Sequence, residues 1–404
     1  MHILLIHQAF AALDEAGGTR HYEMAQFLVR HGHRVTIIAS PVSYLTGEKS
    51  TRGSGWVDRS QPEPGITILR TYTYPALHRS FVHRIFAFVS FMVSSFIAGL
   101  GVRQVDLVWG TSPPIFQGMT AWLLARLKRK KLLFEVRDLW PAFAIAVGVL
   151  RNPLLIRLSL GLEKFLYRHA DQMIVNSPGY LEHVQQRGAR QATLIPNGAD
   201  PEMFDPGLDG EPFRAQHNLQ GKFIVLYAGA HGMSNDLDVL LDAAAILSGS
   251  HQLRFVLVGD GKEKSRLQQR ACDLNLDNVL FLPSVPKNEM KVVLAAADAC
   301  IAILKPIELY KTTYPNKVFD YMAAGRPVVL AIDGVVREVV EKAGAGIPVP
   351  PGNSQALAQA VADLQRSPEH TRQMGLAGRA YIETTFNRQI FNRQFMELCE
   401  KLVQ

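Results

Sequence analysis

The sequence is poor in cysteine and has no low-complexity block. Only three cysteines occur among its 404 residues, Cys272, Cys300 and Cys399, and they lie far apart. An odd and widely spaced set suits neither a disulfide framework nor a zinc site with paired ligands. We therefore expect three buried thiols in a reducing compartment. The run from Met1 to His7 has no basic segment and is too short for a secretory signal, so we expect a cytoplasmic protein.

Acidic residues are in the minority, and several binding signatures are missing. The chain has 43 basic and 36 acidic residues, and the resulting charge of +7 favours an anionic partner. The basic residues are scattered, and the short run Lys128 to Lys131 has no aromatic companions, so we expect no nucleic acid partner. No His-Glu-x-x-His pattern occurs, and Asp236 and Asp238 open a predicted helix, where capping explains them. We expect no metal and no cofactor.

What the sequence does contain is a strand and helix alternation that occurs twice. Amphipathic stretches such as Thr19 to Arg30 separate short β-branched or leucine-rich runs. The runs lie at 3–6, 35–39, 66–70, 105–109, 131–136 and 172–175, and then at 223–228, 253–258, 279–282, 299–304 and 327–331. A stretch rich in proline, glycine and charge, from Pro196 to Lys222, separates the two series.

This pattern predicts an α/β protein built from two parallel, doubly wound, Rossmann-like domains with a cleft between them. We expect the domains at 1–200 and 201–384. We expect the helix at 385–404 to pack back on the first domain.

Loops that follow the predicted strands are the first place to look for a ligand site. Gly17 and Gly18 precede the first helix without the Gly-x-Gly-x-x-Gly spacing, and Gly229 and His231 occupy the matching loop of the second half. Gly259 and Gly261 follow another strand of that half. Such loops can present backbone amides to phosphate, although plain turn formation explains each of them as well.

The segment from Asn316 to Gly325 gives the clearest signal. It predicts a helix with Asn316 as N-cap and Gly325 as terminator. Lys317 and Asp320 share one face, where the cation could bind a diphosphate and the carboxylate a ribose diol. An intrahelical ion pair on a solvated face is the alternative.

Three charged residues follow the strand at 131–136. Glu135, Arg137 and Asp138 are expensive to bury unpaired, and they end a strand on the side where ligands bind in such sheets. They could bind a substrate or transfer its proton, or could form a salt bridge that anchors the loop.

Four segments carry a family resemblance. They are Ile195 to Asp200, Val258 to Gly261, Val279 to Pro283, and Pro315 to Gly325 followed by Arg326 to Val329. In order and spacing they resemble the retaining glycosyltransferases of the glycogen-synthase-like superfamily, family four. The chain is similar to its bacterial O-antigen and capsule branch, including N-acetyl-L-fucosamine transferases.

The resemblance implies a GT-B fold and a nucleotide-sugar donor held mainly by the C-terminal domain. With the loops above it implies a donor site comprising Gly17, Gly18, Gly229, His231, Gly259, Gly261, Val285, Asn316, Lys317 and Asp320. It implies an acceptor held mainly by the N-terminal domain, near Glu135, Arg137 and Asp138.

The chain also departs from the family pattern. Of the two glutamates that the family often places eight positions apart, the second is Asp320 here and the first is Thr312. The segment from Ala228 to Asp238 lacks the usual arginine and lysine, which makes Lys317 the obvious phosphate ligand. The histidine that often follows the fourth N-terminal strand is absent from the stretch Gly110 to Pro114.

The segment 78–102 is long and apolar. Its eighteen residues from Ile85 to Val102 carry no charge, and His78, Arg79, His83 and Arg84 precede them. A transmembrane span would separate strands of one sheet, so we expect a core helix that also makes peripheral membrane contact.

These features predict a retaining hexosyltransferase, with a polyprenyl-linked glycan or lipid as acceptor, on the inner face of a bacterial inner membrane. A UDP-sugar is the expected donor. A UDP-sugar 2-epimerase of the same fold and a non-catalytic glycolipid- or nucleotide-sugar-binding subunit are the alternatives.

Overall fold

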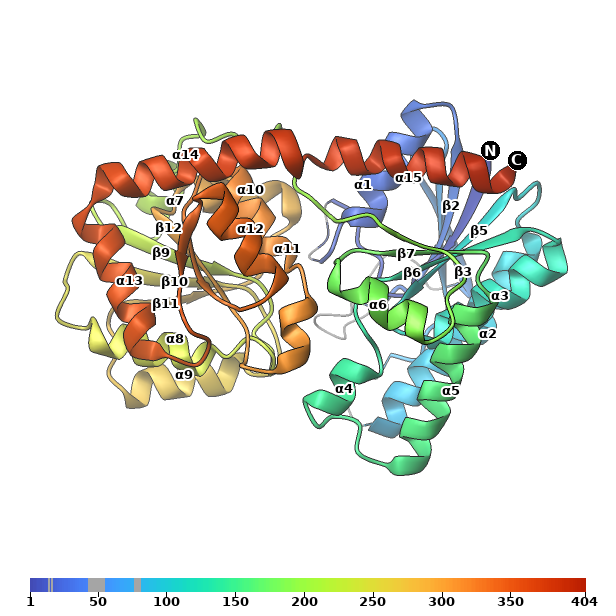
Figure 1. Cartoon of the computed structure of the whole chain (residues 1–404), viewed down its shortest axis with the longest axis horizontal. Coiled ribbons are helices and arrows are strands. Elements are labelled where there is room, and N and C mark those ends of the chain that lie inside the picture. The colour runs from blue at the N-terminus through green and yellow to red at the C-terminus, as the bar shows by residue number, and fades with distance from the viewer. Residues whose placement is uncertain (14, 16, 43–54, 76–80) are drawn as a thin grey trace. The chain divides into compact units, whose positions relative to one another are not determined.

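The protein is described by a computed structural model that covers residues 1–13, 15, 17–42, 55–75 and 81–404 (Figure 1). The chain divides into two compact units. Unit 1 contains residues 1–12, 17–196 and 389–404, and unit 2 is formed mainly by residues 197–388. Each unit has its own sheet and its own hydrophobic core.

Unit 1 is built on an eight-stranded sheet in the order β3-β4-β2-β1-β5-β6-β7-β8. The strands are β1 (His2–Ile6), β2 (Arg34–Ala39), β3 (Val57–Glu63), β4 (Ile66–Thr71), β5 (Leu107–Ser112), β6 (Lys131–Val136), β7 (Gln172–Val175) and β8 (Ala192–Leu194). Only β3 runs antiparallel to its neighbour, β4. The buried runs on β1, β2 and β6 fit a sheet that is covered on both faces. The chain order reverses between β1 and β5, which makes the carboxyl end of β1 a switch point where ligands bind in such sheets.

The helices of unit 1 connect successive strands. They are α1 (Arg20–Arg30), α2 (Phe81–Gly101), α3 (Phe116–Lys128), α4 (Ala142–Ala146), α5 (Pro153–His169), α6 (Gly179–Gln186) and, at the end of the chain, α15 (Arg388–Val403). Helix α1 ends as its sequence requires, because Gly32 takes a φ of 83° just after it. Phe395 of α15 packs against the buried Trp109 of β5, with 4.6 Å between ring centroids.

Unit 2 is built on a six-stranded parallel sheet in the order β11-β10-β9-β12-β13-β14. Its strands are β9 (Phe223–Ala228), β10 (Leu253–Val258), β11 (Val279–Leu282), β12 (Ala299–Ile303), β13 (Val328–Ala331) and β14 (Gly346–Pro348). Its helices are α7 (Glu211–Gln216), α8 (Leu237–Ile246), α9 (Lys264–Asp273), α10 (Lys287–Ala295), the 3-10 helix η1 (Glu308–Thr312), α11 (Asn316–Ala323), α12 (Val335–Ala343), α13 (Ser354–Arg366) and α14 (Pro368–Thr385). The switch point lies between β9 and β12.

The two Rossmann-like sheets confirm the predicted fold class, with corrections of detail. Strand β5 begins and ends later than the run predicted at 105–109. Strands β3, β8 and β14 were not predicted, because β3 is polar and exposed and the other two have only three residues each. Cys272 is exposed on α9, so the expectation of three buried thiols was wrong, whereas Cys300 and Cys399 are buried.

Candidate functional site

Two glycine loops meet at the carboxyl edge of the unit 2 sheet. A Cβ atom on Gly259 would lie 1.9 Å from the carbonyl oxygen of Gly229, and one on Gly261 would lie 2.5 Å from the carbonyl oxygen of His231. All three glycines have positive φ, between 152° and 155°. Only glycine allows two backbone segments to approach this closely. The loops after β9 and β10 therefore form one tightly packed backbone surface at the switch point.

Lys317 lies at the start of α11, beside the loop after β9. Its Nζ donates a hydrogen bond of 2.9 Å to Tyr227 Oη and lies 4.0 Å from the centroid of that ring. Within the described part of the chain the ammonium has no carboxylate partner. Burial lowers the pKa of Lys317 to about 7. A phosphate that reached Lys317 would stabilise its charged form, because desolvation strengthens charge-assisted hydrogen bonds.

Asp320 lies one turn further along α11 and is only partly satisfied. Its Oδ2 pairs with Lys287 Nζ, whereas Oδ1 is buried and has no hydrogen-bond partner among the described residues. Arg388 Nη2 lies 3.9 Å from Oδ1. Burial raises the pKa of Asp320 against the opposing effect of Lys287. The free oxygen is an acceptor that a ligand hydroxyl can fill.

Asn316 ties α11 to the turn that opens unit 2. Its Oδ1 accepts a hydrogen bond from Asn197 Nδ2. Arg388 donates to the carbonyl oxygens of Asn197 and Gly198, at 3.2 and 3.1 Å. Asn316 is thus the first helical residue rather than the N-cap, and Pro315 precedes it. The turn, the helix start and Asp320 form one connected polar network.

His231 is fully buried, and neither of its ring nitrogens has a partner among the described residues. Burial, assisted by Lys264, lowers the pKa of His231 to about 4. The ring is therefore neutral at pH 7 and lies 5.9 Å from Phe281, centroid to centroid, in an edge-on contact. Its backbone closes the loop, since its amide donates to the Asp260 carbonyl and its carbonyl accepts from the Glu263 amide. Val285 is half-buried in the loop between β11 and α10.

In unit 1, Glu135 is buried near the end of β6 and is fully paired. Its two oxygens lie 2.9 Å from Arg20 Nε and 2.7 Å from His21 Nε2. Arg20 also donates to the carbonyl oxygens of Ile195 and Pro196. Burial alone would raise the pKa of Glu135, but His21 and Arg20 outweigh it and lower the pKa to about 2. The geometry shows Glu135 joining α1 to the sheet as an ionised carboxylate.

Arg137 and Asp138 have different surroundings from Glu135. Arg137 donates to Thr111 Oγ1 at 2.8 Å and to the Pro113 carbonyl, which holds the loop after β5. Asp138 is exposed to solvent, yet the protein around it raises the pKa of its carboxyl to about 6, against the opposing charge of Arg137. Of the three charged residues, Asp138 has the carboxylate that is left available for a ligand.

His7 completes the unit 1 cluster at the end of β1. Its ring is fully buried, has no hydrogen-bond partner among the described residues, and lies 4.2 Å from the His21 ring. Burial, and then His21, lower the pKa of His7 well below its usual value. Gly17 and Gly18 are exposed before α1, and a Cβ on Gly17 would lie 2.9 Å from that of Ala11.

No group of three or more potential metal ligands occurs in the part of the chain that the structure describes. Asp238 forms ion pairs with Arg266 and Arg270, each at 2.7 Å. Asp236 precedes α8 with a φ of 45°. The expectation that the protein uses no metal stays a prediction.

Two family matches together span most of the chain. Residues 16–198 match the "Glycosyl transferase 4-like domain" and residues 222–367 match "Glycosyl transferases group 1". The chain belongs to the group 1 glycosyltransferases. This glycosyltransferase is 24% identical to the "Putative colanic acid biosynthesis glycosyl transferase WcaI" of Escherichia coli, over 93% of both chains.

Solved structures agree with the fold of this glycosyltransferase. Sucrose-phosphate synthase from Thermosynechococcus elongatus matches with a TM-score of 0.81 and 22% identity, covering 99% of this chain and 98% of the other. Anabaena Alr3699/HepE in complex with UDP-glucose matches with a TM-score of 0.72 and 19% identity, covering 99% and 100%. The fold is therefore GT-B, with two Rossmann-like domains.

Sequence reasoning missed several residues around the glycosyltransferase site. Tyr227 and Lys287, which contact Lys317 and Asp320, lie 90 and 33 positions away from them. Tyr321 accepts from the Ala228 amide and donates to its carbonyl, which fixes α11 to the end of β9. The only available signal was the position of Tyr321 on the same face as Lys317, at i+4.

Proposed function

We propose that the protein transfers a hexosyl group from a nucleoside diphosphate sugar, with retention at the anomeric carbon, to a lipid-linked glycan. The proposed setting is the synthesis of a bacterial surface polysaccharide, as the name of the E. coli relative suggests. The observation that carries the proposal is the pair of incomplete groups on α11. Among the residues that the structure describes, Lys317 has no carboxylate partner and one oxygen of Asp320 has no hydrogen-bond donor.

A UDP-sugar is the donor that we propose. The spacing of Lys317 and Asp320 by one helical turn, about 5 Å of rise, suits a diphosphate on the cation and a ribose on the carboxylate. Asp320 Oδ1 can accept from a ribose hydroxyl while Oδ2 stays paired with Lys287. The complex of Anabaena HepE with UDP-glucose, a protein of similar fold, adds support for this class of donor.

In the proposed reaction the acceptor hydroxyl attacks the anomeric carbon from the face that the diphosphate leaves. The bond from that carbon to the phosphate oxygen breaks, the new glycosidic bond forms, and the hydroxyl proton passes to the departing phosphate oxygen. Lys317 and the amides of the loop 229–232 would stabilise the charge that develops on the diphosphate. Asp138 would orient the acceptor hydroxyl, because its side chain is exposed.

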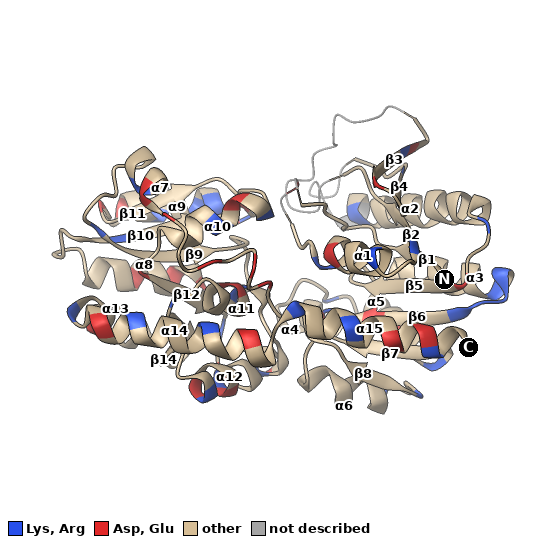
Figure 2. Cartoon of the chain, turned by 90° about the horizontal axis from the view of Figure 1, so that it is seen from above, with Lys and Arg blue, Asp and Glu red and all other residues tan. Residues whose placement is uncertain are grey.

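Helix α2 supports a membrane-bound acceptor. Its inner face packs on β2, β4 and α3, and Ala87 and Phe91 are fully buried there. Its outer face carries a stripe of apolar side chains that are each about half exposed, namely Phe86, Val89, Val93, Ile97 and Leu100. Figure 2 shows α2 almost free of charged residues, whereas charged residues of both signs lie along α14. His78 and Arg79, which the sequence also suggested, lie outside the described residues.

By length and composition, the stretch His83–Gly101 of α2 could cross a membrane. A helix packed on two strands of a soluble sheet cannot do so without removing that face from its core. We propose instead that the stripe lies in the headgroup layer, on the inner face of the inner membrane.

An apolar pocket of about 120 Å³ lies at the start of α2. Phe88, Phe116, Trp140 and Leu155 line it, and Arg84 is the one cation among its lining residues. Pro113 and Pro114, just after β5, also contribute to its wall. The pocket could receive an apolar part of the acceptor lipid while Arg84 contacts a phosphate.

One assay tests the reaction. Purified protein is incubated with a panel of UDP-sugars and GDP-sugars, with and without polyprenyl phosphate glycolipids in detergent, and free nucleotide and products are measured. We expect UDP release that depends on the lipid acceptor, and NMR of the product should show the anomeric configuration of the donor. Isomerised UDP-sugar without acceptor would indicate an epimerase, and binding without turnover would indicate a non-catalytic subunit.

A second assay tests the membrane contact. Val89→Glu with Val93→Glu should release the protein from anionic liposomes at low salt while leaving UDP binding intact. The matched control is Ile246→Glu with Leu376→Glu, which adds the same charge at exposed apolar positions of unit 2. A wild type that ignores anionic liposomes at low salt contradicts the proposal.

A further inference from the structure

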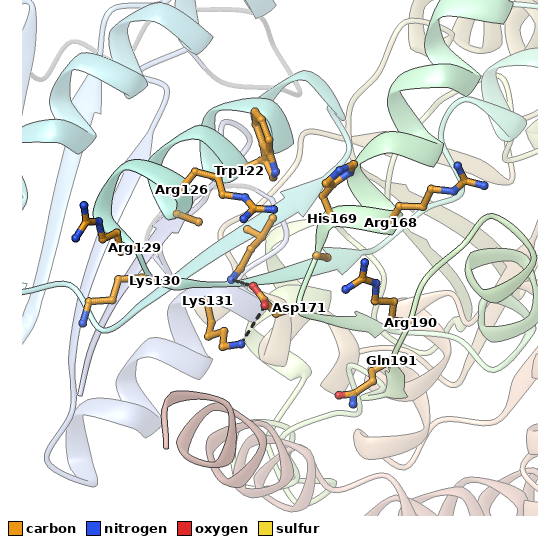
Figure 3. Close-up of a pocket in the computed structure, with 13 residues that line it drawn as sticks. Trp122, Arg126, Arg129, Lys130, Lys131, Arg168, His169, Asp171, Arg190 and Gln191 are labelled. Atoms are coloured by element: carbon orange, nitrogen blue, oxygen red, sulfur yellow. Dashed lines mark hydrogen bonds and ion pairs between the residues drawn. The ribbon is translucent and has the colours of Figure 1, made fainter.

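A second, strongly basic pocket lies at the opposite edge of the unit 1 sheet from the acceptor residues. It has a volume of about 660 Å³ and is shown in Figure 3. Its cations come from the end of α3, the start of β6, the end of α5 and the turn before β8, and they are Arg126, Arg129, Lys130, Lys131, Arg168 and Arg190. Asp171 is the only carboxylate among the lining residues.

The single carboxylate of this basic pocket is already in use. Asp171 Oδ1 pairs with Lys131 Nζ at 3.2 Å, and Oδ2 accepts from the Leu132 amide at 2.9 Å. Lys130 pairs weakly with Asp106 outside the pocket, at 3.8 Å. Within the described ranges, the four arginines have no ion-pair partner. Like charges that converge on one concave surface repel each other, and a bound anion relieves that repulsion.

Helix capping explains only part of this charge. Arg126 and Arg168 lie in the last turns of α3 and α5, where cations complement the helix dipole. Arg129 follows α3 with a left-handed φ of 55°, and Arg190 lies in a turn that belongs to neither helix. Arg129 is the C-cap residue of α3, where a cation also complements the helix dipole, but Arg190 has no helix end to complement and still lines the same pocket.

The wall of the basic pocket also has a free donor. Trp122 lines it and packs edge-on against Phe165 and His169, with centroids 4.9 and 6.1 Å apart. Its indole Nε1 is buried and has no acceptor among the residues that the structure describes. A donor of this kind, next to unpaired guanidinium groups, suits an oxygen-rich anion.

We propose that this pocket binds a ligand with two or more phosphate groups, either a soluble oligophosphate or the headgroups of anionic phospholipids. Several arginines from separate elements can each form forked hydrogen bonds to phosphate, which a monovalent anion would not satisfy. The pocket is distinct from the proposed acceptor site. Lys131 and Arg137 lie at opposite ends of β6, roughly 20 Å apart at about 3.3 Å per residue. The inference does not rest on the proposed glycosyl transfer.

The test uses two double variants. The pocket variant combines Arg126→Glu and Arg190→Glu, and the control combines Arg30→Glu and Arg34→Glu. The control pair changes the net charge equally, at exposed arginines of unit 1 outside the pocket. Inorganic tripolyphosphate is titrated by calorimetry, and flotation is measured with vesicles of phosphatidylcholine alone or with added phosphatidylglycerol. Circular dichroism and urea unfolding, measured alongside, report that each variant is folded.

We expect the pocket variant to lose binding at least tenfold while the control keeps it, and we expect added salt to weaken the wild type. Saturable binding of tripolyphosphate identifies a soluble ligand. Loss confined to phosphatidylglycerol vesicles identifies lipid headgroups. Equal behaviour of the two double variants toward both probes would overturn the proposal.

Discussion

The carboxyl edges of the two sheets differ in how their buried charges are satisfied. In unit 1, Glu135 has a partner on each oxygen, and its pKa is lowered to about 2. In unit 2, and within the described part of the chain, one oxygen of Asp320 has no hydrogen-bond donor and Lys317 contacts only the hydroxyl and ring of Tyr227 as polar partners. Glu135 lies at the end of strand β6, whereas Lys317 and Asp320 lie on helix α11. The difference shows which buried groups complete the fold and which leave room for a ligand.

The physical reason is the cost of burial. An unpaired buried charge is expensive, so a group that serves only the structure is normally paired within the chain. Groups that stay incomplete at a switch point keep interaction energy for a ligand, at some expense of stability. His7 is the exception in unit 1, since neither of its ring nitrogens has a hydrogen-bond partner among the described residues.

The largest expected effect is the loss of stability on replacing Glu135. If stability did not fall, the contrast between the two units would be wrong. Glu135→Gln should lower the free energy of unfolding by about 3 to 5 kcal/mol, because Arg20 is left buried without a counter-charge. Urea unfolding measures this change. The control is Glu163→Gln, whose partners Arg187 and His183 are more exposed and can be hydrated, so its loss should be smaller.

The pH dependence of Glu135 gives a second check on the same variant. Its folded pKa is depressed, so its stabilising contribution is present above its unfolded pKa and is lost as the pH falls toward about 2. The difference in stability between wild type and Glu135→Gln should therefore shrink in acid.

Lys317→Ala should weaken UDP binding by about 1.5 to 3 kcal/mol, since a charge-assisted hydrogen bond to phosphate is lost. The stability of the free protein should not fall, because the variant removes a buried cation whose pKa is lowered to about 7. Calorimetry and urea unfolding measure the two quantities. Unchanged UDP affinity in a folded variant would remove Lys317 from the site, and a loss of stability would show that it supports the fold as Glu135 does.

Asp320→Asn should cost about 1.5 kcal/mol of UDP binding, because one acceptor oxygen is replaced by a donor. Pyrophosphate, which has no ribose, serves as the control ligand and should bind equally to both proteins. If UDP also binds equally, Asp320 is only the partner of Lys287.

A smaller effect concerns protons. Phosphate favours charged Lys317, so UDP binding at pH 8 should take up a proton and affinity should fall as the pH rises through about 7. Calorimetry in two buffers of different ionisation enthalpy measures the uptake. Lys317→Arg stays charged and should show none, and equal uptake by both proteins would assign the proton to another group.

The smallest expected effect is that of a chelator. Turnover should be unchanged in EDTA, because Lys317 and loop amides can stabilise the diphosphate without a metal ion. Activity that returns only with Mg²⁺ or Mn²⁺ would redirect attention to Asp236 and Asp238.

The sequence by itself determined the alternation of strands and helices and the face that each helix buries. Strands β6, β9 and β10 begin and end where their apolar runs predict, because a buried parallel strand must be apolar on both faces. The edge strand β3 was not predicted, since an exposed strand needs no apolar run. Local periodicity also placed Lys317 and Asp320 on one face of α11.

Only the tertiary structure decided which charged groups have ion-pair or hydrogen-bond partners within the chain. Glu135 meets Arg20 across 115 positions, and Asp320 meets Lys287 across 33. Such partners are chosen by the packing of separate elements, on which local periodicity carries no information. The packing of separate elements therefore gives a paired structural anchor in one unit and an incompletely paired, proposed ligand site in the other.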